Sequence, residues 1–431
     1  MRSSTDVRTE ATRRKIALFG VFGVGNLGNE CTLQALIYNI QKYVPQAEVS
    51  CICSGVQETR SAYNIPASLI REMPLSPINN LMLRLLRRIF VGIPIEFFRW
   101  LKAISKLKDV DMLVMTGTGM LGDFGIPPFG LHYEILKWTV IAKLCRCKVL
   151  FLSVGAGPIH HPLSRRFVKA ALSCADYRSY RDQFSKDYLK SIGFDSERDY
   201  VYPDLAYSFP TAMMPPANRN GGSHETVIGV GLMTYFNRRS ILPKDETIYR
   251  DYIAKLGHFV SWLLEKKYTV RLVIGDAAYD HRARHDLSAF IEECGTTYEN
   301  GRIIDEPAAS VDDVLSQLAA TDLVVASRFH NVLLALMLGK PVLAVSYHEK
   351  VDALMAEVGL AEFCQDIESI DLEKMIRQFA TLEEHSNYLQ QQLQRKAEAC
   401  RVALDDQYER IFGKPLGFDC RSALSRAASN N

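Results

Sequence analysis

The chain has 431 residues, of which 48% are hydrophobic and 23% charged, and its formal net charge is +2. This length is too great for one ordinary domain, so we expect two. The composition excludes a disordered or fibrous chain, and the balanced charge predicts no nucleic-acid partner. The ten cysteines are scattered without the C-x-x-C spacing of common zinc sites. They predict reduced thiols, a cytoplasmic location and no metal site.

The first half of the chain alternates apolar runs with helix-like segments. Apolar runs at 15–22, 111–121 and 147–159 each contain or approach glycines at their carboxyl end, and helical patterns occupy 30–44 and much of 177–193. This alternation is typical of a parallel sheet with helices on both faces.

A second alternation of the same kind follows a stretch rich in Pro, Gly, Asn and Ser. We expect that stretch, 211–225, to link two domains. An N-terminal Rossmann-like domain is predicted at 15–210 and a C-terminal one at 226–372. A charged helical segment at 373–412 is expected to pack back across the first domain, ahead of a tail at 413–431. Ligands should bind in the cleft between the carboxyl ends of the two sheets.

Three glycine-rich turns follow strands of the first domain. They contain Gly25, Gly119 and Gly155, and together they favour a ligand surface lined by backbone, although each alone could serve only tight packing. A dinucleotide site would need an acidic residue at the end of the second strand. The chain has Cys53 and Ser54 there, which disfavours a nucleotide-dependent oxidoreductase.

The segment "SRFH" lies where an apolar strand of the second domain ends and a helix begins. Ser327 ends the strand, and Arg328 and His330 fall at the helix N-terminus, which attracts anions. A guanidinium suits carboxylate or phosphate, and an imidazole transfers protons near neutral pH. Lys350, after the next strand, could add a point charge. The alternatives are an interdomain ion pair for Arg328, a core histidine and a solvated lysine.

Several ordered motifs resemble those of the polysaccharide pyruvyl transferase family. They are "GNLGNE", "TGTGMLGD", "YRSYRDQFSKDYLKSIG", "PDLAYSF" and "SRFHNVLLALMLGKPVLAVSYHEKV". The resemblance implies a GT-B-like fold, with two Rossmann-like domains facing a central cleft. It also implies transfer of pyruvate from phosphoenolpyruvate, as a ketal, to a sugar of a surface or extracellular polysaccharide or its lipid-linked precursor, with release of phosphate and no separate cofactor.

The resemblance also implies roles for particular residues. His330 falls on the family's catalytic histidine, as general acid or as the group that stabilises phosphate departure. Arg328 falls on the donor-binding arginine, and Arg181 on a second donor contact. Glu30 or Asp123 would position or deprotonate the acceptor hydroxyl. The predicted substrate-binding residues are Arg328, Arg181, Lys350, Gly25, Asn26, Gly119 and Ser327.

The opening motif departs from the family pattern at one position. Asn29 stands where the family commonly has Asp, which questions acceptor choice or activity. Two alternatives therefore stay open beside the pyruvyl transferase. One is a GT-B glycosyltransferase that uses a nucleotide sugar, and the other is an inactive assembly or lipid-binding relative.

A basic amphipathic insert occupies 79–108. Arg84, Arg87 and Arg88 recur at helical spacing, and a second basic face, made of Arg99, Lys102 and Lys106, follows a break at Gly92 and Pro94. Such helices can lie in a membrane interface, so peripheral contact at the inner face of the membrane is one expectation. The other is a pair of helices that cover the sheet, with the basic residues reaching into solvent.

Overall fold

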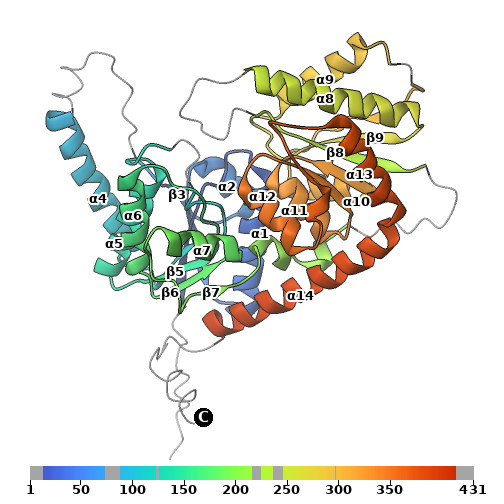
Figure 1. The fold of residues 1–431 in the computed structure, drawn as a ribbon. Helices are drawn as coiled ribbons and strands as arrows, with labels where there is room; N and C mark the ends of the chain where they lie inside the picture. The colour runs from blue at the N-terminus through green and yellow to red at the C-terminus, as the bar shows by residue number, and fades with distance from the viewer. Residues whose placement is uncertain are drawn as a thin grey trace, which may run out of the picture.

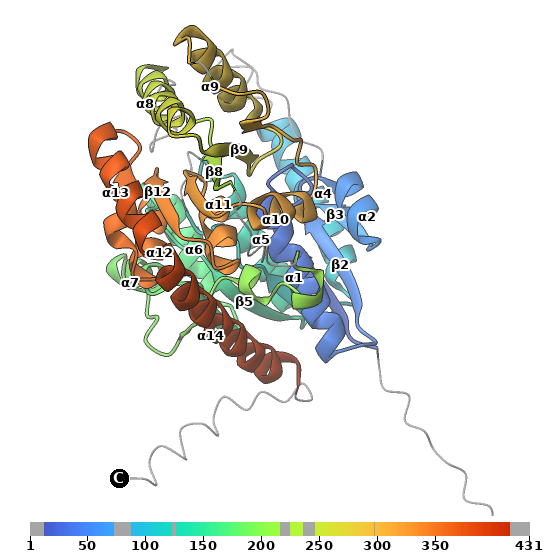
Figure 2. The same cartoon turned by 90° about the vertical axis from the view of Figure 1, so that its right-hand side faces the viewer.

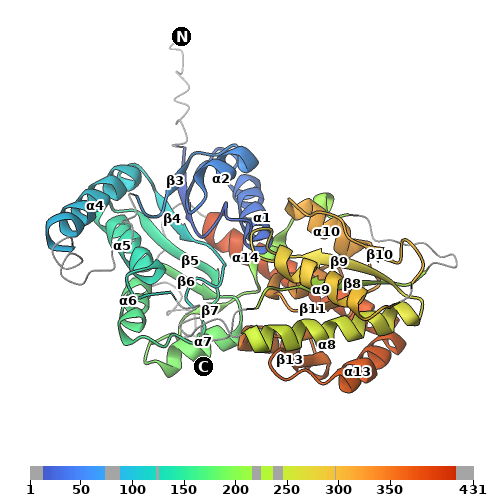
Figure 3. The ribbon, with the colours of Figure 1, turned by 90° about the horizontal axis from the view of Figure 1, so that it is seen from above.

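The computed structural model describes residues 13–72, 88–122, 126–215, 225–235, 246–296 and 298–413. Figures 1 and 3 show two α/β domains side by side. Asp123, residues 79–87 of the insert, most of the predicted linker and the tail from 414 lie outside the described residues. Among the helices that are described, none is both long and apolar enough to cross a membrane.

The first domain is built on a parallel sheet. In the described residues its seven strands have the order β3-β2-β1-β4-β5-β6-β7. They are β1 (Lys15–Phe19), β2 (Glu48–Cys53), β3 (Ala67–Leu69), β4 (Met112–Met115), β5 (Lys148–Val154), β6 (Tyr177–Tyr180) and β7 (Tyr200–Val201). Strand β4 is apolar and buried along its whole length because helices cover both faces of the sheet. The order reverses between β1 and β4, which places a ligand crevice at their carboxyl ends.

Helices of the first domain connect successive strands across the two faces of this sheet (Figure 1). The main ones are α1 (Leu27–Tyr43), α2 (Val56–Tyr63), α4 (Ile93–Leu107), α5 (Leu131–Leu144), α6 (Pro162–Ser173) and α7 (Gln183–Ser191). Two short 3-10 turns, η2 (Leu205–Ser208) and η3 (Thr211–Met213), lead out of the domain.

The second domain repeats this architecture. Its six described strands, all parallel to their neighbours, have the order β10-β9-β8-β11-β12-β13. They are β8 (Val227–Leu232), β9 (Thr269–Ile274), β10 (Ile303–Ile304), β11 (Leu323–Ala326), β12 (Val342–Ser346) and β13 (Cys364–Asp366). The helices are α8 (Glu246–Glu265), α9 (His281–Glu293), α10 (Val311–Ala319), α11 (Phe329–Met337), α12 (Glu349–Glu357) and α13 (Leu372–Glu384), with the turn η4 (Ala361–Phe363). The order reverses between β8 and β11, so the junction of β11 and α11 lies at the ligand-binding edge.

The last helix, α14 (Ser386–Phe412), returns to the first domain, as the sequence predicted (Figure 2). The Tyr408 hydroxyl is 2.8 Å from the Ser208 hydroxyl, and Gln407 Nε2 donates to Ser179 Oγ at 2.8 Å. Tyr202 donates to Asp406 at 2.8 Å. The prediction of two Rossmann-like domains with C-terminal helices packed back is confirmed.

The insert differs in detail from its prediction. Gly92 has right-handed helical dihedral angles, φ −66° and ψ −44°, so the π-turn η1 (Arg88–Gly92) continues directly into α4 without the expected break. Pro94 is tolerated because the first turn of a helix needs no N–H donor there. Arg99 does not belong to a solvated basic face. It is buried and donates to the Glu72 carbonyl at 2.7 Å.

Candidate active site

The glycine-rich loop after β1 is joined to the second domain by its backbone. Ala277 N–H donates to the Gly25 carbonyl at 2.9 Å, and Leu27 N–H donates to the Gly275 carbonyl at 3.1 Å. Asn26 lies between these two bonds in an antiparallel bridge to the second domain. Gly25 and Asn26, predicted to bind substrate, thus use backbone groups to hold the two ligand-binding edges together.

His330 lies directly across this contact, in the first turn of α11. A Cβ atom added to Gly28 of α1 would be 1.9 Å from His330 Cγ, so only glycine leaves room for the imidazole. His330 Nε2 is buried and has no hydrogen-bond partner. Burial, and then the positive charges of Arg181, Lys350 and Arg328, lower the pKa of His330 well below its usual value. The imidazole is therefore neutral near neutral pH before any ligand binds.

Arg328 is the residue before α11, and carboxylates of its own domain fix it. Its Nε and Nη2 atoms donate to the two carboxylate oxygens of Asp280 at 2.7 and 2.6 Å. Asp276 lies 3.7 Å from Nη1. Burial alone would lower the pKa of Arg328, but these carboxylates raise it above its usual value. An ion pair is therefore present, as one interpretation of the sequence held, although it lies within the second domain rather than between domains.

Arg181 joins two motifs of the first domain to the second domain. It follows β6, is buried, and pairs with Asp182 at 3.2 Å and with Asp204 at 3.4 Å. The Arg-Asp and Pro-Asp motifs therefore meet in space. The guanidinium carbon lies 4.2 Å from the centre of the Phe329 ring, a cation–π contact. A Cβ atom on Gly155 would be 2.7 Å from that carbon, so the third glycine turn makes room for Arg181.

Lys350 is half-buried beside the same aromatic ring. Its Nζ atom lies 5.5 Å from the ring centre of Phe329 and 4.9 Å from that of Tyr347. Burial, and then the charges of Arg181 and Arg328, lower the pKa of Lys350 well below its usual value. Lys350 is thus not an ordinary solvated lysine. We call Arg181, Arg328 and Lys350, which surround His330, the cationic cluster.

Glu30, predicted to act on the acceptor, has a structural set of partners. Its carboxylate accepts hydrogen bonds from Gly23 N–H at 2.7 Å and from the Tyr63 hydroxyl at 2.9 Å. Burial raises the pKa of Glu30, and these two bonds oppose the rise. Because Glu30 follows Gly28 by two residues, it lies on the opposite face of α1 from His330. The structure does not bring Glu30 to the cationic cluster.

Two further predicted residues face other parts of the molecule. The Ser327 hydroxyl is 3.0 Å from the hydroxyl of Tyr252, inside the second domain. The Gly119 carbonyl accepts from Gly122 N–H at 3.2 Å and closes its own turn. Asp123, the third residue predicted to be catalytic, follows this turn and lies outside the described residues.

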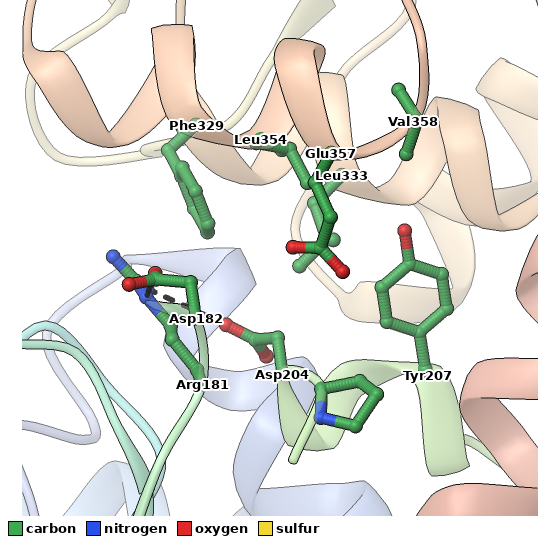
Figure 4. Close-up of a pocket in the computed structure, with 10 residues that line it drawn as sticks. Arg181, Asp182, Asp204, Tyr207, Phe329, Leu333, Leu354, Glu357 and Val358 are labelled. Carbon is green, nitrogen blue, oxygen red and sulfur yellow. Dashed lines mark hydrogen bonds and ion pairs between the residues drawn. The ribbon is translucent and has the colours of Figure 1, made fainter. Parts of the chain in front are cut away.

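A pocket of about 360 Å³ lies beside the cationic cluster, between the first domain and helices α11 and α12 (Figure 4). Its lining holds three carboxylates, Asp182, Asp204 and Glu357, against one guanidinium, Arg181. Glu357 reaches from α12 toward the first domain, near Tyr207. This lining suits neutral hydroxyl groups and disfavours an anionic group.

Sequence reasoning missed the carboxylates Asp276 and Asp280 that hold Arg328. The signal was available, because both follow the apolar strand β9 at the edge where ligands bind. The aromatic rings of Phe329 and Tyr347, which separate the cations, were missed because apolar residues at strand ends resemble ordinary core. Within the described parts of the chain, no three His, Cys, Asp or Glu side chains group as metal ligands would.

Comparison with known proteins places this architecture in the GT-B class. UDP-N-acetylglucosamine 2-epimerase from Neisseria meningitidis has a TM-score of 0.55 and 14% identity, over 93% of this chain and all of the other. HepE from Anabaena, solved with UDP and glucose, has a TM-score of 0.57 and 15% identity, over 94% of this chain and all of HepE. At these identities the likeness shows the fold alone.

The family follows from the sequence comparisons. A family model described as polysaccharide pyruvyl transferase matches residues 26–349, which include every member of the cationic cluster except Lys350. The chain belongs to the polysaccharide pyruvyl transferase family, as its motifs indicated. It is also similar to the amylovoran biosynthesis protein AmsJ of Erwinia amylovora, at 20% identity over 95% of this chain and all of that protein. The general function is therefore that of a transferase family linked to exopolysaccharide biosynthesis.

Proposed function

We propose that this protein transfers pyruvate from phosphoenolpyruvate to two hydroxyl groups of one sugar, giving a cyclic ketal and phosphate. Family membership supports a pyruvyl transferase. The observation that carries the proposal is the convergence of three cations from two domains on a buried imidazole whose Nε2 has no partner. Phosphoenolpyruvate brings a carboxylate and a phosphate in one small molecule, which suits clustered cations in a site that excludes water.

The reaction forms two bonds to the same carbon, the first by addition and the second by displacement of phosphate. A proton goes to the methylene carbon of phosphoenolpyruvate, which becomes a methyl group, while the first sugar hydroxyl attacks the neighbouring carbon and loses its proton. The second hydroxyl then attacks that carbon as the bond to the phosphate oxygen breaks. The proton of the second hydroxyl leaves with phosphate or through a base. His330 is the chain's candidate to supply a proton in the first step or to stabilise phosphate in the second.

The lowered pKa of His330 has a consequence for this role. A neutral imidazole is too weak an acid to protonate carbon, so His330 must be charged in the donor complex when it acts as the acid. The negative charge of phosphoenolpyruvate would raise the pKa of His330 by offsetting the cations around it. We infer that the donor binds together with a proton, so His330 becomes a charged acid only when a donor is bound.

The cations must also be available to the donor. Arg328 already donates two hydrogen bonds to Asp280, and Arg181 also forms ion pairs with carboxylates. A guanidinium has five N–H donors, so it can keep one carboxylate and still bind an anion. Asp280 would then orient Arg328 as a positioning residue. The carboxylate-lined pocket beside Phe329 would accept sugar hydroxyls of the acceptor, whether polymer or lipid-linked precursor.

Calorimetry of donor binding tests the proposal. Phosphoenolpyruvate should bind the wild type, and Lys350→Ala should weaken that binding because it removes a cation of the cluster while Arg328 keeps its ion pair with Asp280. Release of phosphate in the presence of acceptor should require His330, with a loss of about 10²- to 10⁴-fold in His330→Ala. Full turnover in His330→Ala would contradict the assignment.

A nucleotide-sugar glycosyltransferase is the second candidate, because HepE shares the fold and was solved with UDP and glucose. A panel of nucleotide sugars in the same calorimeter separates the two. Binding of a nucleotide sugar but not of phosphoenolpyruvate would favour the glycosyltransferase. Silence towards both donors, even with acceptor fragments present, would favour the inactive relative.

A further inference from the structure

Helix α4 presents an apolar face that nothing among the described residues covers. The side chains of Phe90, Ile93, Phe97 and Leu101 are 72%, 64%, 66% and 48% exposed. Their spacing of three or four residues puts them on one side of the helix. A stripe of large exposed apolar side chains marks an interaction surface, because scattered single residues are the normal case on a soluble domain.

The opposite side of α4 already packs on the domain, so the exposed stripe is not needed for the core. Ala103 and Leu107 are buried against the sheet side of the helix. Trp100 donates to the Tyr133 hydroxyl of α5 at 3.2 Å. The helix is therefore already anchored by one face, and the exposed stripe is a second apolar face that points away from the domain.

Positive charge lies on another side of the same helix. A surface pocket of about 250 Å³ beside α4 is lined by four basic residues, Arg99, Lys102, Lys106 and Lys137, and by the single acid Glu72. Arg99 and Lys137 are buried and share Glu96, whereas Lys102 and Lys106 are exposed. Lys102 also lies 5.6 Å from the ring centre of Phe98. Lys102, which is exposed, could therefore hold an anionic group on the flank of α4 between the apolar stripe and this pocket.

We propose that α4 docks this protein on the surface of an anionic lipid bilayer. The apolar stripe would insert at the boundary of headgroups and acyl chains, while Lys102 and Lys106 contact lipid phosphates. Helix α4 lies at the outer edge of the first domain (Figure 1), where a flat bilayer could reach it. A second copy of the chain fits less well, because two α4 helices face to face would oppose the same lysines.

The direction of α4 relates this surface to the candidate site. The helix ends at Leu107 and leads into the amino end of β4, which begins at Met112. Its beginning, with Phe90 and Ile93, therefore lies toward the carboxyl edge of the sheet, the edge that also carries the cationic cluster. A membrane-bound acceptor would meet the site from that side. The docking inference goes beyond the proposed function and stands whichever donor the enzyme uses.

Vesicle flotation of the full chain tests the inference. The wild type should float with vesicles of phosphatidylglycerol and phosphatidylcholine in equal parts, and much less with phosphatidylcholine alone. Phe97→Asp with Leu101→Asp should weaken binding about tenfold or more, because two charges would enter the apolar layer. Lys102→Glu with Lys106→Glu should weaken binding less, and by an amount that shrinks as salt is added.

The matched control is Tyr388→Asp with Val402→Asp on α14, two exposed apolar residues far from α4. It should float like the wild type, and phosphate release with a soluble acceptor should be unchanged by the α4 variants. Equal loss in the control, or no flotation of the wild type, would overturn the inference. So would a wild-type dimer that Phe97→Asp converts to a monomer, since the stripe would then be an interface between copies. A failure of donor binding would bear only on the proposed function.

Discussion

The loop after β1 in the first domain and the junction of β11 with α11 in the second face each other across the domain contact, yet they contribute different things. The first loop is made of glycines and gives backbone contacts and space, above all at Gly28. The second gives side chains, Arg328 and His330, with fixed charge and a buried proton carrier. Of these two segments, the first therefore supplies room and the second supplies chemistry, and neither makes a site alone.

Positive charge nevertheless reaches the imidazole from both domains. Arg181 comes from the first domain but extends over Phe329 of the second. A glycine turn, at Gly155, gives it the necessary space. The first domain thus contributes one cation through a gap in its own backbone, and the two remaining cations come from the second domain. Four predictions test this comparison, from the largest expected effect to the smallest.

Removal of Arg328 should have the largest effect on stability. Arg328→Ala leaves the fully buried Asp280 without its partner, which should cost about 3–5 kcal/mol of unfolding free energy. Urea denaturation measures this cost. Arg284→Ala, which breaks a surface pair with Asp305, should cost about 1 kcal/mol or less. If the two variants lost the same unfolding free energy, the buried ion pair between Arg328 and Asp280 would not stabilise the second domain as described.

Filling the space at Gly28 should have the second largest effect. Gly28→Ala places a methyl group on the His330 ring and should destabilise the protein by about 1–3 kcal/mol. In a His330→Ala background the same change should be neutral or stabilising, by up to about 1 kcal/mol, because alanine favours helix. Thermal unfolding of the four proteins in this cycle measures the reversal of sign. If the changes in stability from the two substitutions simply added, Gly28 would not be needed to leave room for the imidazole.

Donor binding should depend on pH through His330. The pKa of the free imidazole is lowered, so the imidazole is neutral near pH 7, and a bound anion raises that pKa. Affinity for phosphoenolpyruvate should therefore rise as pH falls from about 8 to 6, with proton uptake, by up to about tenfold per pH unit. Calorimetry in buffers of different ionisation enthalpy counts the protons. Comparison with His330→Ala cancels the donor's own ionisation, and identical uptake in both proteins would contradict the role of His330.

A charge added to the first loop should have the smallest effect. The Asn29 amide donates to the Val21 carbonyl at 3.1 Å, so Asn29→Asp loses that bond. The cost should be about 1 kcal/mol, partly offset by the favourable position of a carboxylate at a helix N-terminus. Turnover should change less than about tenfold. A larger gain in turnover would mean that the segment after β1 also supplies chemistry, and the division between room and charge would fail.

Much of the fold was predictable because local sequence patterns indicate its strands and helices. Apolar strands and glycine turns identified both sheets, and the helical pattern after residue 373 identified the helices that pack back. The insert was predicted less well. A glycine and a proline suggested a break, but Gly92 keeps helical angles and Pro94 falls in a first turn, where its missing N–H costs nothing. Arg99 looked like a surface residue because burial by a neighbouring helix leaves no local signal.

For the candidate site, the sequence by itself determined which residues carry charge and where each lies on its element. Arg328 and His330 were placed at a helix start, and Arg181 after a strand, from pattern alone. Only the tertiary structure decided that they meet around one imidazole, that Asp280 occupies Arg328, and that Glu30 faces away. The physical reason is that local periodicity fixes the direction of a side chain relative to its own helix or strand. Partners from distant segments, and hence pKa shifts and ion pairs, depend on how the two domains pack.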